Sequence, residues 1–117
     1  MLHAVFTDVS TDTNELMHYQ YDDSSGEWLK RCGMAQRTSI TPALAGYHGQ
    51  LYCVFVAEDS RHTLLYTIWN PRDGWRQERV CNGELAKGTP ALCVIDDQLH
   101  LLFVAKKVGD RRFAAKR

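Results

Sequence analysis

The sequence predicts an all-β protein in which four-stranded antiparallel sheets repeat along the chain. Two observations favour this class. The apolar segments are five to seven residues long, rich in Val, Ile, Leu, Phe and Tyr, and separated by clusters of turn-forming residues, which is the pattern of short strands. The same segments also recur at a nearly constant spacing of 47 to 49 residues. No segment of useful length has the period of an amphipathic helix.

The repeat is clearest in one strand that occurs three times. The segments LHAVF, LYCVF and LHLLF begin at Leu2, Leu51 and Leu99, at offsets of 49 and 48. Other landmarks recur once each: LMHYQY at 16–21 and LLYTIW at 64–69, Trp28 and Trp75, and TPAL at 41–44 and 89–92. A repeat of about 40 to 50 residues with four strands is typical of the blade of a β-propeller.

Each blade is predicted to contain strand A (TPAL), strand B (LYCVF), strand C (LLYTIW) and strand D, which opens at a tryptophan. From residue 1 the order is B, C, D, then A, B, C, D, then A, B, or about two and a quarter blades in residues 1–105. The proline of TPAL stands at a strand start, where its missing N–H does least damage. Strand B is apolar without interruption from Leu51 to Ala57, so we expect both of its faces to be covered.

Turns are expected between these strands, because the separating segments are rich in Asp, Asn, Gly, Pro and Ser. They are TDVSTDTN (7–14), DDSSGE (22–27), YHGQ (47–50), AEDSRH (57–62), NPRDG (70–74), NGELAKG (82–88) and IDDQ (95–98). The acidic pairs Asp22-Asp23 and Asp96-Asp97 fall in these turns, where Asp is expected for backbone reasons.

An incomplete propeller predicts a homo-oligomer. Known propellers have at least four blades, and a pair of blades would leave apolar sheet faces in water. We therefore expect copies of the chain to complete the ring as a dimer of four or five blades or a trimer of six or seven. The strand at 89–94 could complete a blade of another copy, but the surplus B strand, present at both 2–6 and 99–103, fits neither ring cleanly.

Composition excludes several partners. Lys plus Arg and Asp plus Glu number 14 each, so no global field attracts nucleic acid or an anionic membrane. Residues 106–117 carry six basic side chains against Asp110, and this basic tail is expected to be a solvated terminus, with a partner-binding arm as the alternative. The N-terminus lacks the pattern of a signal peptide, and no segment is apolar for long enough to span a bilayer. The expected location is therefore the cytoplasm.

The sequence favours a binding protein over an enzyme. It contains no GxSxG, HExxH or phosphate-binding glycine loop. Its four cysteines include no CxxC and no Cys/His pair at zinc spacing. Cys53 and Cys93 lie in apolar runs, while Cys32 and Cys81 occupy equivalent places in successive repeats, so buried thiols are expected. We predict no cofactor and no metal.

Residues 2–29 and 41–75 resemble the blade repeats of bacterial and fungal lectin-like propellers, which carry PALA, a Gly turn, LYCV and tryptophan-containing strands. The similarity covers about residues 2 to 105, and short two-blade bacterial fucose lectins that trimerise are the nearest parallel. The resemblance implies monosaccharides bound between blades by aromatic stacking, an Arg and a Glu. The Arg position corresponds here to Ala4 or Cys53, and the Glu position to His18 or Tyr66.

The ending RRFAAKR resembles that of many short proteins encoded by bacterial integron gene cassettes.

These considerations predict a carbohydrate-binding, lectin-like module, with a protein-interaction scaffold ring that lacks a small-molecule site as the alternative. The candidate ligand-binding residues are His18, Tyr19, Tyr21, Asp59, Arg61, His62, Tyr66 and Trp69. Aromatic faces with a few polar groups can hold a sugar. The competing interpretation is that the aromatic residues pack the core and blade interfaces, and that Asp59, Arg61 and His62 form a solvated turn.

Overall fold

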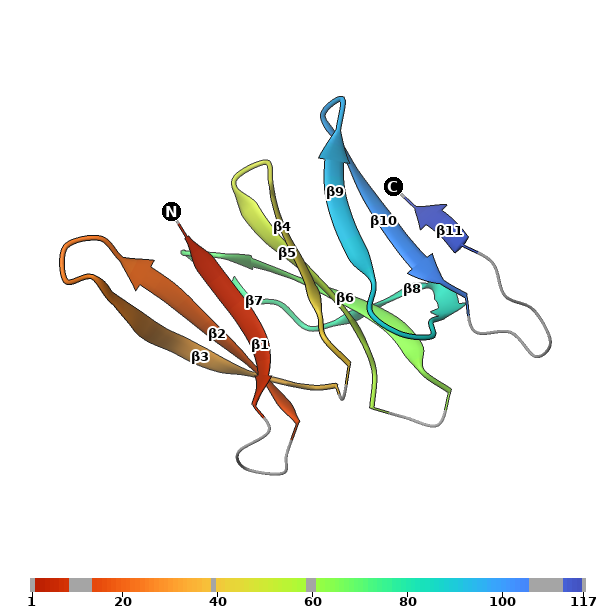
Figure 1. Ribbon diagram of the computed structural model, residues 1–117, viewed down its shortest axis with the longest axis horizontal. Coiled ribbons are helices and arrows are strands. Elements are labelled where there is room, and N and C mark those ends of the chain that lie inside the picture. The colour runs from red at the N-terminus through yellow and green to blue at the C-terminus, as the bar shows by residue number, and fades with distance from the viewer. Residues whose placement is uncertain (1, 9–13, 39, 59–60, 106–112, 117) are drawn as a thin grey trace.

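The computed structural model describes residues 2–8, 14–38, 40–58, 61–105 and 113–116. These residues form antiparallel β-strands arranged in three sheets, and the strands follow the predicted order along the chain. Figure 1 shows the sheets side by side along the longest axis of the molecule. The prediction of an all-β fold is confirmed.

The first sheet contains β1 (His3–Asp8), β2 (Glu15–Asp22) and β3 (Glu27–Arg37), in that spatial order. These strands correspond to the predicted B, C and D strands of the first repeat. The β2–β3 hairpin turns through residues 23–26, where Gly26 has a φ of 73°. The Asp22 carboxylate accepts hydrogen bonds from the backbone N–H and the hydroxyl of Ser24, which is the local role expected of Asp before a turn.

The middle sheet has all four predicted strands. It contains β4 (Ala43–Tyr47), β5 (Gln50–Val56), β6 (Thr63–Asn70), β7 (Gly74–Trp75) and β8 (Arg79–Leu85). Both β7 and β8 pair with β6, so strand D is divided into two segments.

The turn predicted at 82–88 is wrong in its first half. Strand β8 continues through Leu85, which pairs with Thr63, and the β6–β8 ladder shifts register between Thr63 and Leu65. Such an irregularity lets a strand contain turn-forming residues without ending the pairing. The NGE segment lies within this irregularity, and the pairing of Val80 and Leu85 on either side of it keeps β8 on β6.

The third sheet contains β9 (Ala91–Ile95), β10 (Gln98–Val104) and β11 (Phe113–Lys116), with β10 in the middle. Strands β9 and β10 correspond to the predicted A and B strands. Strand β11 lies in the basic segment 106–117 and was not predicted. It pairs with β10 in the place that strand C occupies in the other sheets.

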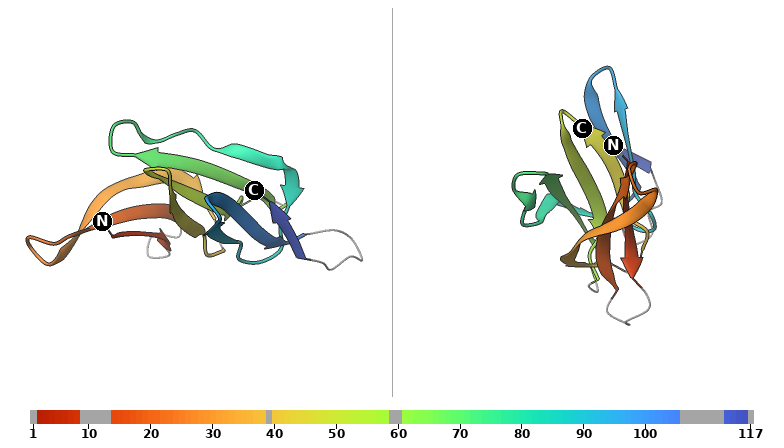
Figure 2. Two further views of the ribbon diagram at one scale, coloured as in Figure 1. Left: turned by 90° about the horizontal axis from the view of Figure 1, so that it is seen from above. Right: turned by 90° about the vertical axis from the view of Figure 1, so that its left-hand side faces the viewer.

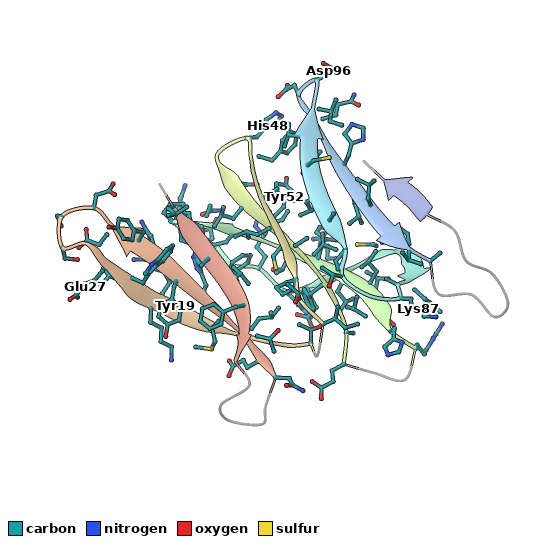
Figure 3. All side chains as sticks on the ribbon, in the orientation of Figure 1. Tyr19, Glu27, His48, Tyr52, Lys87 and Asp96 are labelled. Atoms are coloured by element: carbon teal, nitrogen blue, oxygen red, sulfur yellow. The ribbon has the colours of Figure 1, made fainter. Side chains whose placement is uncertain are left out.

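Two equivalent hairpin tips join the middle and third sheets. The β4–β5 turn contains His48 and Gly49, with φ values of 48° and 75°, and the β9–β10 turn contains Asp96 and Asp97, with φ values of 51° and 60°. Two positive φ angles in a two-residue loop define the hairpin turn that matches strand twist. The Tyr47 hydroxyl donates to the Asp97 carbonyl at 2.6 Å, and His48 Nε2 lies 3.0 Å from Asp97 Oδ1. Figure 3 shows His48 and Asp96 at these neighbouring tips.

Strand β5 is covered on both faces. Cys53 and Phe55 point toward the first sheet and pack in one cluster with Leu16 and Val5. The alternate side chains of β5, beginning with Val54, point toward the third sheet. There Val54 and Val56 pack with Leu64, Ala86, Leu101 and Phe103. The expectation for strand B is therefore confirmed, and the view from above in Figure 2 shows the succession of sheets that provides this cover.

The described sheets form an open stack and not a closed ring. Among the described residues, no further sheet lies beyond the outer face of the first sheet or the outer face of the third. Large apolar side chains are exposed there, including Phe6 in the first sheet and Leu102 in the third.

Truncation of Phe55 should strongly destabilise the fold. Its ring is 1% exposed at the centre of the first cluster, so Phe55→Ala leaves a cavity and should lower the free energy of unfolding by about 3 to 5 kcal/mol. Val80 in β8 is 52% exposed, and the matched change Val80→Ala should stay within about 0.5 kcal/mol. Urea unfolding followed by circular dichroism measures both. Equal effects of the two substitutions would contradict the packing described here.

Candidate functional site

Two histidines and two tryptophans gather where the first and middle sheets meet. We call this set the His–Trp cluster; it contains His3 of β1, His18 of β2, Trp69 of β6 and Trp75 of β7. The His3 and His18 rings are stacked with centroids 5.1 Å apart, and Trp69 lies edge-on to both at 5.1 and 4.9 Å. Trp75 is edge-on to His18 at 5.4 Å. The register of β1 and β2 puts His3 and His18 on one face of the first sheet, as the two-residue period of a strand requires.

Hydrogen bonds determine the proton positions in the cluster. The indole N–H of Trp75 is 3.3 Å from His18 Nδ1, and since an indole can only donate, Nδ1 is the acceptor. The proton of neutral His18 therefore lies on Nε2, which donates to His3 Nδ1 at 2.9 Å. A neutral His3 then carries its own proton on Nε2. The Nε2–H of His3 is therefore the one imidazole donor of His3 and His18 that is not used between the two rings.

Both imidazoles are held neutral by their surroundings. Burial lowers the pKa of His18 from 6.5 to about 4, and the neighbouring His3 and Arg31 contribute in the same direction. Burial also lowers the pKa of His3, assisted by the amino terminus and Arg31. A positive charge is unfavourable here because burial removes part of its hydration and the nearby charges are themselves positive.

A cavity of about 410 Å³ adjoins the cluster. It lies between the start of β1, the β4–β5 hairpin and the end of β6, and we call it the junction cleft. Its lining residues are His3, Gly46, Tyr47, His48, Gly49, Gln50, Leu51, Trp69 and Pro71. Tyr47 and His48 stack with ring centroids 3.9 Å apart. The cleft thus combines aromatic rings with imidazole and amide groups, and its lining residues include neither Asp, Glu, Lys nor Arg.

Two further cavities lie beside strand D of the first and middle sheets. One, of about 470 Å³, is lined by residues of the β2–β3 hairpin, including Tyr21 and Arg31. The other, of about 300 Å³, lies between β6 and the segment before β8 and includes Tyr66 and Arg76. Their positions are equivalent in the repeat. The lining residues around Tyr21 are mainly exposed and, unlike those of the junction cleft, include charged side chains such as Asp22 and Arg31.

The predicted ligand residues fall into separate groups. His18 and Trp69 meet in the His–Trp cluster, and Trp69 also lines the junction cleft. Tyr66 packs against the core between the middle and third sheets. Tyr19 stacks on Phe6, with centroids 5.3 Å apart, and Tyr21 lies edge-on to Trp28 at the same distance. The structure therefore joins only His18 and Trp69 of these aromatic and imidazole candidates.

The loop candidates do not join the cleft. Arg61 and His62 precede β6, whereas Trp69 lies near its far end beside Leu51. The His62 carbonyl accepts a backbone hydrogen bond from Ala86, and Arg61 is exposed. Asp59 lies outside the described residues.

Sequence reasoning did not include His3, Trp75, Tyr47 and His48 among the ligand candidates. The repeat equivalents of His3 are Tyr52 and His100, so the repeat alone does not single out its imidazole or indicate its partner His18. The strand period offered a signal for this pair, since it places His3 and His18 on the same face once β1 and β2 are paired antiparallel. Tyr47 and His48 carried no comparable signal, because their position beside the cleft depends on packing between sheets.

The described residues contain no group of three or more His, Cys, Asp and Glu side chains placed to hold a metal ion. Where cysteine side chains are described, Cys53 is buried, and Cys81 and Cys93 are partly buried. Burial raises the pKa of the Cys53 thiol to about 12, which disfavours the reactive thiolate.

Comparison of the sequence with models of protein families, and with curated proteins, finds no match. Within the part of the chain that the structure describes, no helix has the length and apolar character needed to cross a membrane.

Acid should destabilise the protein through His18. Its pKa is about 4 in the folded state against an ordinary 6.5, so the unfolded chain binds more protons between these values. The stability due to neutral His18 is complete above pH 6.5 and is lost as pH falls toward 4. The loss between about pH 7 and about pH 5 should be about 2 kcal/mol.

His18→Gln provides the matched control, because its amide oxygen can still accept from Trp75 but does not titrate. Urea unfolding at both pH values should show a shallower pH dependence for this variant than for the wild type. An unchanged pH dependence would show that His18 is not responsible.

Proposed function

We propose that the protein is a non-enzymatic carbohydrate-binding module, built as an oligomeric β-propeller of the cytoplasm, and that the junction cleft holds a neutral saccharide unit. The observation that carries this proposal is the composition of the cleft. It places the Trp69 and Tyr47 rings around a hollow of about 410 Å³ together with neutral polar groups.

The size and chemistry of the cleft suit a sugar. Pockets for small ligands measure about 300 to 1,000 Å³ and combine apolar walls with a few placed polar groups. The apolar C–H face of a pyranose packs against an aromatic ring, while its hydroxyl groups need donors and acceptors. His3 and Gln50 supply these at the cleft, and His48 offers Nδ1, since its Nε2 contacts the Asp97 carboxylate.

The absence of charged carboxylate, ammonium and guanidinium groups from the lining favours a neutral ligand. A phosphorylated or carboxylated sugar would require a cationic partner to offset its lost hydration. Neutral His3, with its lowered pKa, supplies a hydrogen bond without a charge. The Arg and Glu of the similar fucose-binding lectins have no counterparts in this lining, so we propose a different set of sugar contacts.

A scaffold ring remains the second candidate, and one observation favours it. Val94 and Ile95, at the β9–β10 hairpin, are 44% and 52% exposed. Apolar side chains on a projecting hairpin are suited to contact with another protein.

Titration with a panel of neutral monosaccharides, monitored by NMR chemical shifts, tests the saccharide proposal. Binding should perturb the signals of Tyr47, His48 and Trp69. His48→Ala removes one wall and a ring nitrogen of the cleft, and should weaken binding by about 5- to 30-fold, the factor that corresponds to about 1 to 2 kcal/mol.

His62→Ala is the matched control, since His62 also has a positive φ, 57° against 48° for His48, but lies outside the cleft. It should bind like the wild type. Lack of response to every sugar at millimolar concentration would rule out the saccharide and favour the scaffold.

A further inference from the structure

We infer that two copies of this chain assemble head to tail, with the open face of the third sheet of each copy packed on the open face of the first sheet of the other. The result is a closed ring of six sheets, and not of the four or five blades expected for a dimer from the sequence, because each three-stranded outer sheet occupies its own place in the ring. This inference rests on the propeller ring of the proposed function and does not depend on the saccharide.

The middle sheet shows what each kind of face normally contacts. We call the face of a sheet that points toward the next sheet in the chain its forward face, and the opposite face its rear face. In the middle sheet, Val54 lies on the forward face and Phe55 on the rear face, and they are 4% and 1% exposed. Both faces of this sheet are therefore fully used within one chain.

The open face of the first sheet is a rear face. In the repeat, Phe6 is equivalent to Phe55 and Val5 is equivalent to Val54. Both phenylalanines lie on the rear faces of their sheets, and both valines lie on the forward faces. Yet Phe6 is 44% exposed, whereas Phe55 is 1% exposed. Tyr19 stacks against Phe6 and extends the apolar surface. The sequence thus repeats an interface residue at a place where the described part of the chain provides no neighbouring sheet.

The open face of the third sheet is a forward face. Leu102 is equivalent to Val54 but is 41% exposed instead of 4%. Ala91, which pairs with Leu102, is exposed, whereas its equivalent Ala43 is buried. The two open faces are therefore of opposite kinds, one forward and one rear.

The internal junctions indicate how these faces meet. At the first junction, Val5 of a forward face packs in the same cluster as Phe55 of a rear face. At the second, Val54 and Phe103 share a cluster in the same way. The third pair in this series is Leu102 of one copy with Phe6 of the other. A forward face thus meets a rear face at every junction, which requires a head-to-tail contact.

The number of sheets selects two copies. The described residues of each chain form three sheets, so one, two or three copies provide three, six or nine. Propellers close with about four to eight blades, and only two copies fall within this range. Two head-to-tail contacts then close the ring, which leaves no free face to continue a filament.

Light scattering coupled to size exclusion tests the assembly. The wild type should have twice the 13.4 kDa mass of one chain. Phe6→Lys and Leu102→Glu each place a charge in both contacts of the ring, so each variant alone should elute at the mass of a single chain. Val80→Lys, an equally exposed apolar position of the middle sheet, should remain a dimer. Circular dichroism verifies that every variant is folded.

Mixing the two single-chain variants is the decisive step. In a mixed ring, one contact is wholly wild type and the other brings the two substituted positions together with opposite charges. The mixture should therefore recover the dimer mass. If like faces met instead, only one of the two substitutions would dissociate the dimer. Mixing the two variants would then not restore the dimer by pairing the opposite charges.

A wild type with the mass of one chain, a mass that grows steadily with concentration, or a mixture that stays dissociated would overturn the inference. Because the junction cleft is formed within one chain, the dissociated variants should still bind a sugar. If the wild type is a single chain that binds a sugar, the ring is wrong and the proposed site stands. If the wild type is a dimer that binds no sugar, the ring stands and the proposed site is wrong.

Discussion

The structure depends on one constraint, which is that a β-sheet with apolar side chains on both faces must be shielded on both. Strand β5 meets it by sending Cys53 and Phe55 to one neighbouring sheet and Val54 and Val56 to the other. Hydrophobic burial is the largest favourable term in folding, so this single strand determines the order in which the sheets stack. The same requirement applied to the outer sheets leaves two apolar faces for which the chain has no cover, and their exposure is the physical basis of the proposed assembly.

The candidate site is a departure from that regular packing. At the junction of the middle and third sheets, Tyr66 packs against an apolar core without histidine. Its repeat equivalent His18 instead lies in the first junction among His3, Trp69 and Trp75. Buried polar groups require hydrogen-bond partners, and the indole N–H of Trp75 together with His3 provides them for His18. The first junction therefore combines a structural role with a set of neutral polar groups beside an open cleft. A repeated scaffold with one altered junction is a simple way to position a binding site.

Strand positions were predicted well where the repeat and the two-residue period agreed, as for β5 and β6. The prediction failed where backbone pairing outweighed local preference. Strand β8 spans Asn82 and Gly83 because Val80 and Leu85 on either side of them pair with β6. Strand β11 forms in a basic segment because β10 would otherwise leave an edge unpaired. For the site, the aromatic content of strand C pointed to His18 and Trp69 but not to Tyr47 or His48, whose place at the cleft results from the packing of one sheet on another.

By itself, the sequence determined the all-β class, the period and the fact that strand B needs cover on both faces, since each of these follows from local spacing of apolar residues. It also determined the Asp-containing turns, because positive φ angles are a property of single residues and their neighbours. Only the tertiary structure decided which candidate residues meet, since residues from separate strands become neighbours through sheet pairing and stacking. For the same reason, only the structure shows that Phe6 and Leu102 lie on open faces of opposite kind, because exposure depends on what the rest of the chain can cover.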